Sequence, residues 1–303
     1  MLVNSCITVH NWRREFQRLD GAYAPATMRS YYSDVEAFET WCVARDIAPF
    51  PASVPTVCEF LEDQGKTKAP STVRRRLYAI RKVHRLLRLP DPTYDEDINL
   101  AFRRVRRRRA ARPQQAKGLN APHLKQFLAV QPDSLLGLRN RAMLSLGYEL
   151  LTRRSELVAL KDDDLVMRGD GTLRVLIRRS KADQAGIGRI AFTSTQTAQL
   201  VLDWQDARGD HTNWLFCPVY QGKAVDRCLE SNTVKRVIKE AAGKAGFEKH
   251  DVDRFSGHSM RVGAAQDLLV RGVDTVGIMR AGGWKSLSVL ARYLELAEHN
   301  VWQ

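Results

Sequence analysis

His258 and Arg261 stand three positions apart in the stretch "SGHSMRVGAA" (256–265), where the pattern predicts the start of a helix. Ser256 and Gly257 supply capping and turn signals, and residues three apart share one helix face. The first turn of a helix attracts anions through its free N–H groups. An imidazole and a guanidinium placed there favour binding of a phosphate, and the alternative is a capped helix with a surface arginine.

Three other stretches carry side chains suited to the same chemistry. Arg153 and Glu156 lie one turn apart in a predicted helix within "LLTRRSELVAL", and Lys181 follows the first of two predicted strands. A Gly-Gly-Trp motif ending at Trp284 precedes a predicted helix that carries Tyr293. Taken singly, each has a plainer explanation: a surface ion pair, a loop lysine and a tyrosine at the edge of the core.

The overall charge indicates a polyanionic partner. The 303 residues include 48 Lys+Arg against 34 Asp+Glu, a formal net charge of +14, which favours nucleic acid or an anionic membrane surface. No apolar run approaches the roughly 18 residues of a membrane-spanning helix, and the first residues lack the core of a signal peptide. The five scattered cysteines predict reduced thiols in the cytoplasm and argue against a disulfide scaffold or a zinc site.

The first part of the chain, residues 1–112, is predicted to be a small helical DNA-binding domain. Helical periodicity covers 26–44 and 71–90, with Ser71 as cap and Pro90 as stop, and a short helix is expected near 57–61 before a turn. A further helix ends in "RRVRRRRAAR", which has seven arginines in ten positions. Such density needs an anion to neutralise it, although a solvated basic face explains a single helix equally well. The candidate DNA contacts are Arg74, Arg75, Arg76, Arg81, Lys82, Arg106, Arg107, Arg108 and Arg109.

A polar, Pro- and Gly-containing linker is predicted at 113–119, followed by a second domain at 120–303. A helix is expected after Asn120, a longer apolar helix near 137–151, and a hairpin of two strands at 172–179 and 188–194. The remainder is helical, and Leu287, Leu290, Leu294 and Ala297 are expected to form the buried side of the last helix. The fold class predicted is mainly α with a small β-hairpin or sheet (α+β), in two domains.

In their order along the chain, these motifs resemble the active-site set of the tyrosine recombinase (phage integrase) family. The set comprises Arg-x-Ser-Glu-Leu, a hairpin lysine, His-x-x-Arg, and Gly-Gly-Trp followed nine residues later by Tyr. The stretch 256–293 is especially similar to the Cre branch, which carries Trp where most members have a second His. "NWLFCPV" (213–219) is also similar to a segment of that branch.

The resemblance implies a two-domain clamp that encloses DNA and a catalytic domain at 120–303. It implies a site-specific recombinase that cleaves and rejoins DNA through a 3′-phosphotyrosine and a Holliday junction. The implied roles are Arg153, Arg261 and Trp284 on the phosphate, Lys181 as proton donor, His258 as base or orienting group, Tyr293 as nucleophile, and Glu156 in support.

The implied partners are double-stranded DNA with a specific inverted-repeat site and three further copies of the chain, which form a homotetramer on two duplexes. No membrane, cofactor or metal is expected, and the expected location is the bacterial cytoplasm, at the nucleoid. A type IB topoisomerase and a non-catalytic DNA-binding relative remain as alternatives. We also expect Trp302, near the end of the chain, to contact an adjacent subunit.

Overall fold

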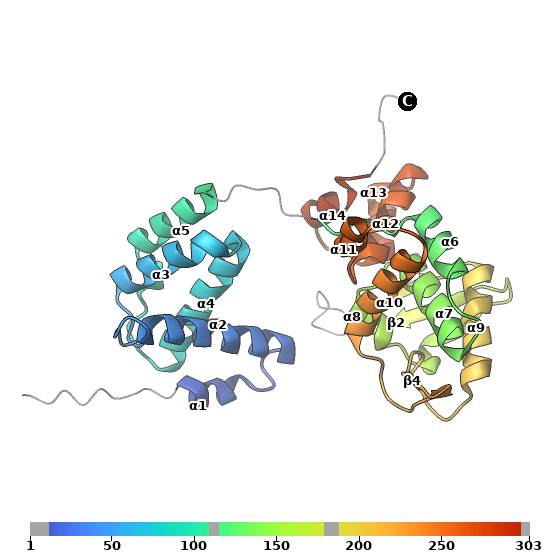
Figure 1. The fold of residues 1–303 in the computed structure, drawn as a ribbon, viewed down its shortest axis with the longest axis horizontal. Coiled ribbons are helices and arrows are strands. Elements are labelled where there is room, and N and C mark those ends of the chain that lie inside the picture. The colour runs from blue at the N-terminus through green and yellow to red at the C-terminus, as the bar shows by residue number, and fades with distance from the viewer. Residues whose placement is uncertain (1–11, 109–114, 179–187, 298–303) are drawn as a thin grey trace, which may run out of the picture. The chain divides into compact units, whose positions relative to one another are not determined.

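The computed structural model describes residues 12–108, 115–178 and 188–297 (Figure 1). The chain divides into two compact units, Met1–Pro113 and Gln114–Gln303. Both are built mainly from helices, and the sheets are small and antiparallel, so the predicted fold class is confirmed. In the described part of the chain, no helix is both long and apolar enough to cross a membrane.

The N-terminal unit is a bundle of helices in which α2 packs against α4 and α3 packs against α5. Its core is aromatic, and the rings of Phe38 and Phe60 meet edge to face with their centroids 5.0 Å apart. The helices are α1 (Trp12–Phe16), α2 (Pro25–Val43), α3 (Val54–Thr67), α4 (Pro70–Leu86) and α5 (Glu96–Arg108), with 3-10 turns η1 (Gln17–Leu19) and η2 (Pro92–Tyr94).

Two boundaries in this unit differ from the prediction. α3 continues to Thr67, into the expected turn, because Gly65 serves helix packing: a Cβ there would lie 2.7 Å from a methyl group of Val105 on α5. α4 begins at Pro70, which occupies a favoured first position, so Ser71 is not the cap. The helix ends at Leu86, ahead of Arg88 with its positive φ of 55°, and Pro90 does not stop it.

The second unit is organised around α7, whose sides are buried nearly all round because α6, α9, α10 and α12 pack on it. The predicted helix after Asn120 is confirmed, and the Asn120 side chain accepts a hydrogen bond from the backbone N–H of His123. The helices are α6 (Ala121–Ala129), α7 (Leu135–Glu149), α8 (Arg154–Val158), α9 (Thr195–Arg208), α10 (Ser231–Lys244), α11 (Lys249–Arg254), α12 (Ser259–Val270), α13 (Thr275–Gly282) and α14 (Leu287–Leu294), with the 3-10 turn η3 (Asp162–Asp164).

The predicted hairpin is present as β2 (Leu173–Ile177) and β3 (Arg189–Phe192), which pair antiparallel with Ile177 opposite Arg189. A third strand, β1 (Leu165–Met167), pairs with the other edge of β2. Three residues are too few to show an alternating pattern, which is why the sequence did not indicate β1. A second small hairpin joins β4 (Val219–Tyr220) to β5 (Lys223–Ala224).

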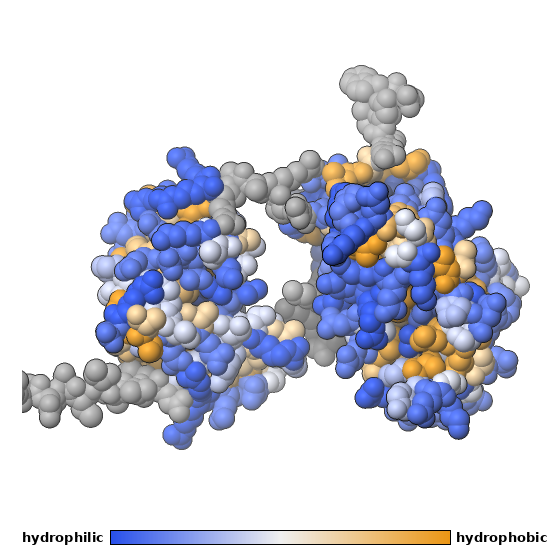
Figure 2. All heavy atoms as spheres, in the orientation of Figure 1, coloured by the Kyte–Doolittle hydropathy of each residue, from blue (hydrophilic) through white to orange (hydrophobic). Residues whose placement is uncertain are grey.

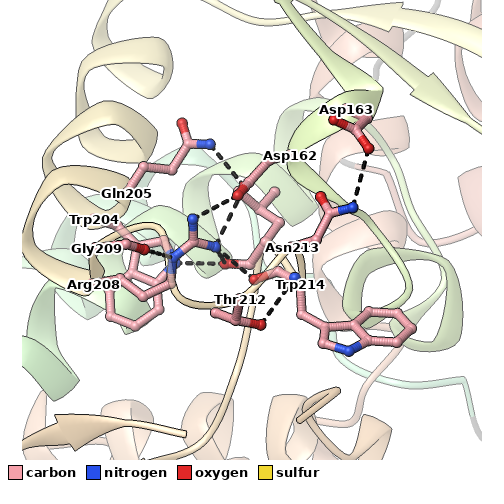
Figure 3. Close-up of polar contacts among 10 residues, drawn as sticks. Asp162, Asp163, Trp204, Gln205, Arg208, Gly209, Thr212, Asn213 and Trp214 are labelled. Atoms are coloured by element: carbon pink, nitrogen blue, oxygen red, sulfur yellow. Dashed lines mark hydrogen bonds and ion pairs between the residues drawn. The ribbon is translucent and has the colours of Figure 1, made fainter. Parts of the chain in front are cut away.

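A buried arginine fixes the chain between α9 and β4 (Figure 3). Arg208 Nη2 lies 2.6 Å from Asp162 Oδ2, and its Nη1 donates to the carbonyl of Trp214 at 2.6 Å. Trp204 Nε1 donates to the carbonyl of Leu215, also at 2.6 Å. Leu215, Phe216 and Cys217 in the middle of the stretch 213–219 are buried in the core, which gives its likeness to the family a structural explanation.

Part of the expected linker belongs to the second unit. The backbone N–H of Lys117 donates to the carbonyl of Arg254 at 3.0 Å, and that of Leu119 donates to the carbonyl of Ser259 at 2.8 Å. The Leu119 side chain is fully buried. Residues 117–119 therefore brace the start of α12 instead of spanning freely between the units.

Candidate active site

Arg261, on α12, is a buried cation with unused donors. Its side chain has no exposed surface, and Nη1 donates to the carbonyl of Leu151. Among the described residues, its Nε and Nη2 have no hydrogen-bond partner. Burial, together with the positive charge of Arg153, lowers the pKa of Arg261 to about 10, so the group stays protonated at neutral pH.

Trp284 forms one wall of the same site. The Arg261 guanidinium lies 3.9 Å from the centroid of its ring, and its Nε1 is buried without a partner among the described residues. Gly283 ends α13 in the left-handed conformation with φ of 67°. A Cβ on Gly282 would lie 1.9 Å from the indole. The two glycines are thus what allows Trp284 to fold in under Arg261.

Tyr293, on α14, completes this wall. Its ring centroid lies 5.1 Å from that of Trp284, and the Arg261 guanidinium carbon lies 5.8 Å from its ring. Gln266 Nε2 on α12 donates to the Tyr293 carbonyl at 3.1 Å, which ties the two helices together. The nucleophile expected from the sequence therefore lies against the buried arginine.

The predicted buried side of α14 is wrong at Leu287, whose side chain is 59% exposed. Leu290 is fully buried, and Val289, Tyr293 and Leu294 pack against the core. Leu287 is the first residue of α14, so its side chain lies beyond the core residues that cover the later turns of the helix. The buried side is rotated toward Tyr293 as a result.

Arg153 is held by a buried carboxylate. It is the N-cap residue of α8 and lies just outside the helix in which the sequence placed it. Glu156, 4% exposed, accepts from the backbone N–H of Arg153 at 3.0 Å and from its Nη1 at 2.5 Å. This pair is not a solvated surface ion pair, because the carboxylate is buried and fixes both ends of Arg153.

His258 is the N-cap residue of α12, so it precedes the helix instead of lying on its face. Ser256 does not cap that helix; its Oγ accepts from the backbone N–H of His258 at 3.1 Å. The imidazole remains exposed at the surface. Partial loss of water around the ring and the charges of Arg154 and Arg261 lower the pKa of His258. The neutral ring, which can accept a proton, therefore predominates at neutral pH.

Arg189 joins this group, although no sequence motif pointed to it. It begins β3, and its side chain donates from Nη1 to the carbonyl of Ala281 at 2.5 Å and from Nη2 to that of Leu150 at 2.6 Å. Burial lowers its pKa to about 10. The one available signal was its register, because it shares the inward face of the strand with the buried Ala191.

The structure thus brings Arg153, Glu156, Arg261, Trp284 and Tyr293 together, with His258 electrostatically coupled to them. Lys181 and Arg109 lie outside the described residues, as does Trp302. Within the described residues, no group of three His, Cys, Asp or Glu side chains has the arrangement of a metal site.

The predicted DNA-contact residues of α4 are braced by local partners. Arg75 makes a bidentate pair with the buried Asp34, at 2.6 and 3.0 Å. Arg76 donates to Gln64, Arg81 to Thr93 Oγ1 at 2.8 Å, and Lys82 to Tyr23 at 2.7 Å.

Arginine and tyrosine side chains alternate along the exposed side of α4 and η2. Tyr78 lies between Arg74 and Arg81, and Tyr94 lies between Arg81 and Arg85, with guanidinium-to-ring distances of 4.0 to 5.5 Å. Each ring restrains the cations beside it. Contacts with the tyrosine rings therefore keep these arginine side chains on the outer side of the helix.

The last turn of α5 carries exposed arginines of another kind. Arg106, Arg107 and Arg108 are exposed, and within the described residues none has an ion-pair partner. The surface of this helix is strongly hydrophilic in the view of Figure 2. Unpaired like charges in one turn repel one another, so an external anion would stabilise them.

Comparison with known proteins decides the family. The model of the phage integrase family matches residues 117–300, more than half of the chain. The chain belongs to the phage integrase family. The resemblance expected from the active-site motifs is therefore confirmed.

Two curated members of this family are similar over most of their length. An integrase/recombinase XerD homologue of Selenomonas ruminantium is 28% identical, over 97% of this chain and 89% of its own. The recombinase Cre of Escherichia phage P1 is 27% identical, over 90% of this chain and 84% of its own.

Solved integrase-family structures share the fold. XerH site-specific recombinase bound to its palindromic difH substrate matches with a TM-score of 0.65 at 15% identity, over 89% of this chain and 76% of that one. A lambda integrase tetramer bound to a Holliday junction matches with a TM-score of 0.63 at 16% identity, over 98% and 80%.

Proposed function

We propose that this protein is a tyrosine site-specific DNA recombinase, and that residues 256–293 supply most of its active site. The observation that carries the proposal is the set of buried, unused donors on Arg261 and Trp284 beside the ring of Tyr293. A buried guanidinium without a carboxylate partner is unfavourable unless an anion binds it. A phosphodiester satisfies these donors, and it brings its phosphorus to the tyrosine.

Tyr293 acts as the nucleophile. Its hydroxyl oxygen forms a bond to the scissile phosphorus, and the bond from phosphorus to the 5′-oxygen breaks, which leaves a 3′-phosphotyrosine. His258, neutral at neutral pH, accepts the tyrosine proton. Lys181 gives a proton to the departing 5′-oxygen, so the step ends with a free 5′-hydroxyl.

Charge on the non-bridging oxygens is balanced by Arg153 and Arg261. Their planar guanidinium groups can each offer two parallel donors, which an ammonium cannot. Trp284 donates one hydrogen bond to the phosphate through its indole N–H and does not act as an acid or a base. Glu156 orients Arg153 through the two hydrogen bonds it accepts and takes no part in the reaction itself.

The reaction so described needs no metal ion and no ATP. The arginines supply the positive charge that a metal supplies elsewhere. The phosphotyrosine keeps the energy of the broken phosphodiester, so a 5′-hydroxyl of another strand can attack it and reverse the step.

The N-terminal unit is the DNA-binding domain. Arg74, Arg75 and Arg81 lie on the side of α4 that is braced by Asp34, Thr93 and the tyrosines. Pre-ordered arginines lose little side-chain entropy when they bind DNA. Arg106 to Arg108 contact phosphates, and Arg76 and Lys82 add positive charge to this surface.

The assembly we propose is a homotetramer on two duplexes in the cytoplasm, each duplex carrying an inverted-repeat site. Support comes from the printed descriptions of the similar structures: XerH binds a palindromic substrate, and lambda integrase forms a tetramer on a Holliday junction.

Covalent capture tests the function directly. The protein is incubated with a fragment library of its native genome, denatured with SDS, and the attached DNA ends are sequenced. We expect one short inverted-repeat sequence with protein on 3′-ends. Relaxation of any supercoiled plasmid without sequence preference would indicate a type IB topoisomerase, and a lack of adducts with intact DNA binding would indicate a non-catalytic relative.

A further inference from the structure

Arg189 connects three segments that are far apart in the sequence. Its side chain reaches from β3 to the carbonyl of Ala281 at 2.5 Å, of Leu150 at 2.6 Å and of Leu151 at 3.5 Å. Ala281 comes directly before the Gly-Gly-Trp turn, and Leu150 and Leu151 form the turn that leads to Arg153. One guanidinium therefore ties together the sheet and the two turns that deliver phosphate-binding side chains.

The carbonyls that Arg189 contacts lie at the C-terminal ends of helices, where they need a hydrogen-bond donor from outside the helix. Leu150 follows the end of α7, and Ala281 lies in the last turn of α13. The final carbonyls of a helix have no partner within it and carry partial negative charge. A single cation placed between two helix C-termini satisfies both and holds them at a fixed separation.

The same turn is held from a second side. Leu151 adopts a φ of 47°, which is unfavourable for leucine and persists only where the surroundings impose it. Its carbonyl accepts from Arg261 Nη1 and lies within reach of Arg189 Nη2. A substitution at Arg189 is therefore expected to move the Leu151 carbonyl, and with it the Arg261 side chain that donates to the same oxygen.

We propose that Arg189 is a positioning residue for DNA cleavage, which sets Arg153, Arg261 and Trp284 relative to one another without contacting DNA. The inference rests on the proposed function. Both of its terminal nitrogens are occupied by main-chain carbonyls, which argues against a further phosphate ligand. Its Cδ would lie 2.9 Å from a Cβ on Gly283, so the side chain passes directly beside the Gly-Gly turn.

The test uses Arg189→Lys and Arg189→Met in the full chain, with Arg174→Met as the matched control. Arg174 is an exposed arginine on the neighbouring strand β2. Three quantities are measured: the single-turnover rate of covalent attachment at saturating site DNA, the Kd for a half-site, and amide hydrogen exchange across 150–152 and 281–284.

Lysine keeps the charge but cannot span three carbonyls, so we expect both Arg189 variants to lose about 10²-fold in cleavage rate. The Kd stays within about threefold of the wild-type value, because general binding comes from phosphate contacts elsewhere. Exchange accelerates at the amides of Leu151, Thr152 and Trp284, whose hydrogen bonds close these turns. Arg174→Met changes none of the three quantities.

Wild-type cleavage by Arg189→Lys would overturn the inference, because charge alone would then suffice. Unchanged exchange at 150–152 and 281–284 in either variant would overturn it as well. If the wild-type protein itself forms no adduct, the proposed function fails, while the exchange measurement still decides whether Arg189 fixes the two turns. If Arg189→Met does not fold, Arg189→Lys gives the answer.

Discussion

Replacement of Arg261 by methionine is expected to make the unliganded protein more stable while it abolishes DNA cleavage. The Arg261 side chain is fully buried, its Nε and Nη2 have no partner, and within the described residues no carboxylate forms an ion pair with it. A buried donor left without a partner costs about 1–3 kcal/mol. The two together therefore cost about 2–6 kcal/mol in the free energy of unfolding.

Two favourable contacts offset part of this cost. The hydrogen bond to the carbonyl of Leu151 contributes about 1.5–3 kcal/mol, and the stack on Trp284 contributes about 0.5–2 kcal/mol. Methionine removes both, but its buried apolar side chain contributes about 1.5–3 kcal/mol and its thioether packs well on an indole. On balance we expect the free energy of unfolding to rise by about 1–3 kcal/mol.

Urea unfolding of the two proteins, followed by fluorescence, measures this difference. Arg208→Met is the matched control, since Arg208 is also buried but is paired with Asp162 and with main-chain carbonyls (Figure 3). Its loss leaves these groups unpaired, and we expect a destabilisation of about 3 kcal/mol. If Arg261→Met is destabilised as much as Arg208→Met, the Arg261 donors are satisfied without DNA and the site is not a preformed anion site.

Three further predictions concern the reaction and the DNA surface. Cleavage is expected to persist in EDTA, because Arg153 and Arg261 supply the positive charge, and a requirement for added magnesium would refute this mechanism. The cleavage rate is expected to fall as the pH drops through the pKa of His258, which lies below the ordinary imidazole value, because the protonated ring cannot accept the tyrosine proton. His258→Gln is expected to lose this dependence, and a retained pH profile would argue against His258 as the base. Substitution of Arg106, Arg107 and Arg108 by Gln is expected to weaken binding to all DNA sequences equally and to reduce the slope of log K against log salt by about 2–3. A loss of binding confined to one sequence would contradict contact with phosphates.

The helices and most of the active-site residues were predictable because their signals are local. Apolar periodicity and the cap at Asn120 depend on a few neighbouring residues, and the structure uses both, whereas the cap expected at Ser71 is replaced by Pro70 at the start of α4. The order of the motifs then placed Arg261, Trp284 and Tyr293 in one site, where the structure brings them together.

What escaped prediction depends on contacts between distant segments. Arg189 has its role only because α7 and α13 end beside β3. A turn was expected after the short helix near 57–61, and only the approach of Val105 to Gly65 shows that the helix continues there and packs closely. Leu287 was placed on the buried side by periodicity, although helix neighbours do not extend that far. Periodicity specifies the faces of a helix, and tertiary packing decides which residues are covered.

The central claim is that Tyr293 becomes covalently linked to DNA, and peptide mapping of the linked protein tests it most directly. Wild-type protein and Tyr293→Phe are incubated with the captured site, denatured with SDS, digested, and the nucleotide-bearing peptide is sequenced by mass spectrometry. The account predicts one modified peptide, with a 3′-phosphate on Tyr293. It also predicts that Tyr293→Phe binds the site normally, since only a hydroxyl is lost, yet forms no adduct. An adduct on Tyr293→Phe, or a wild-type adduct on any other residue, would contradict the account.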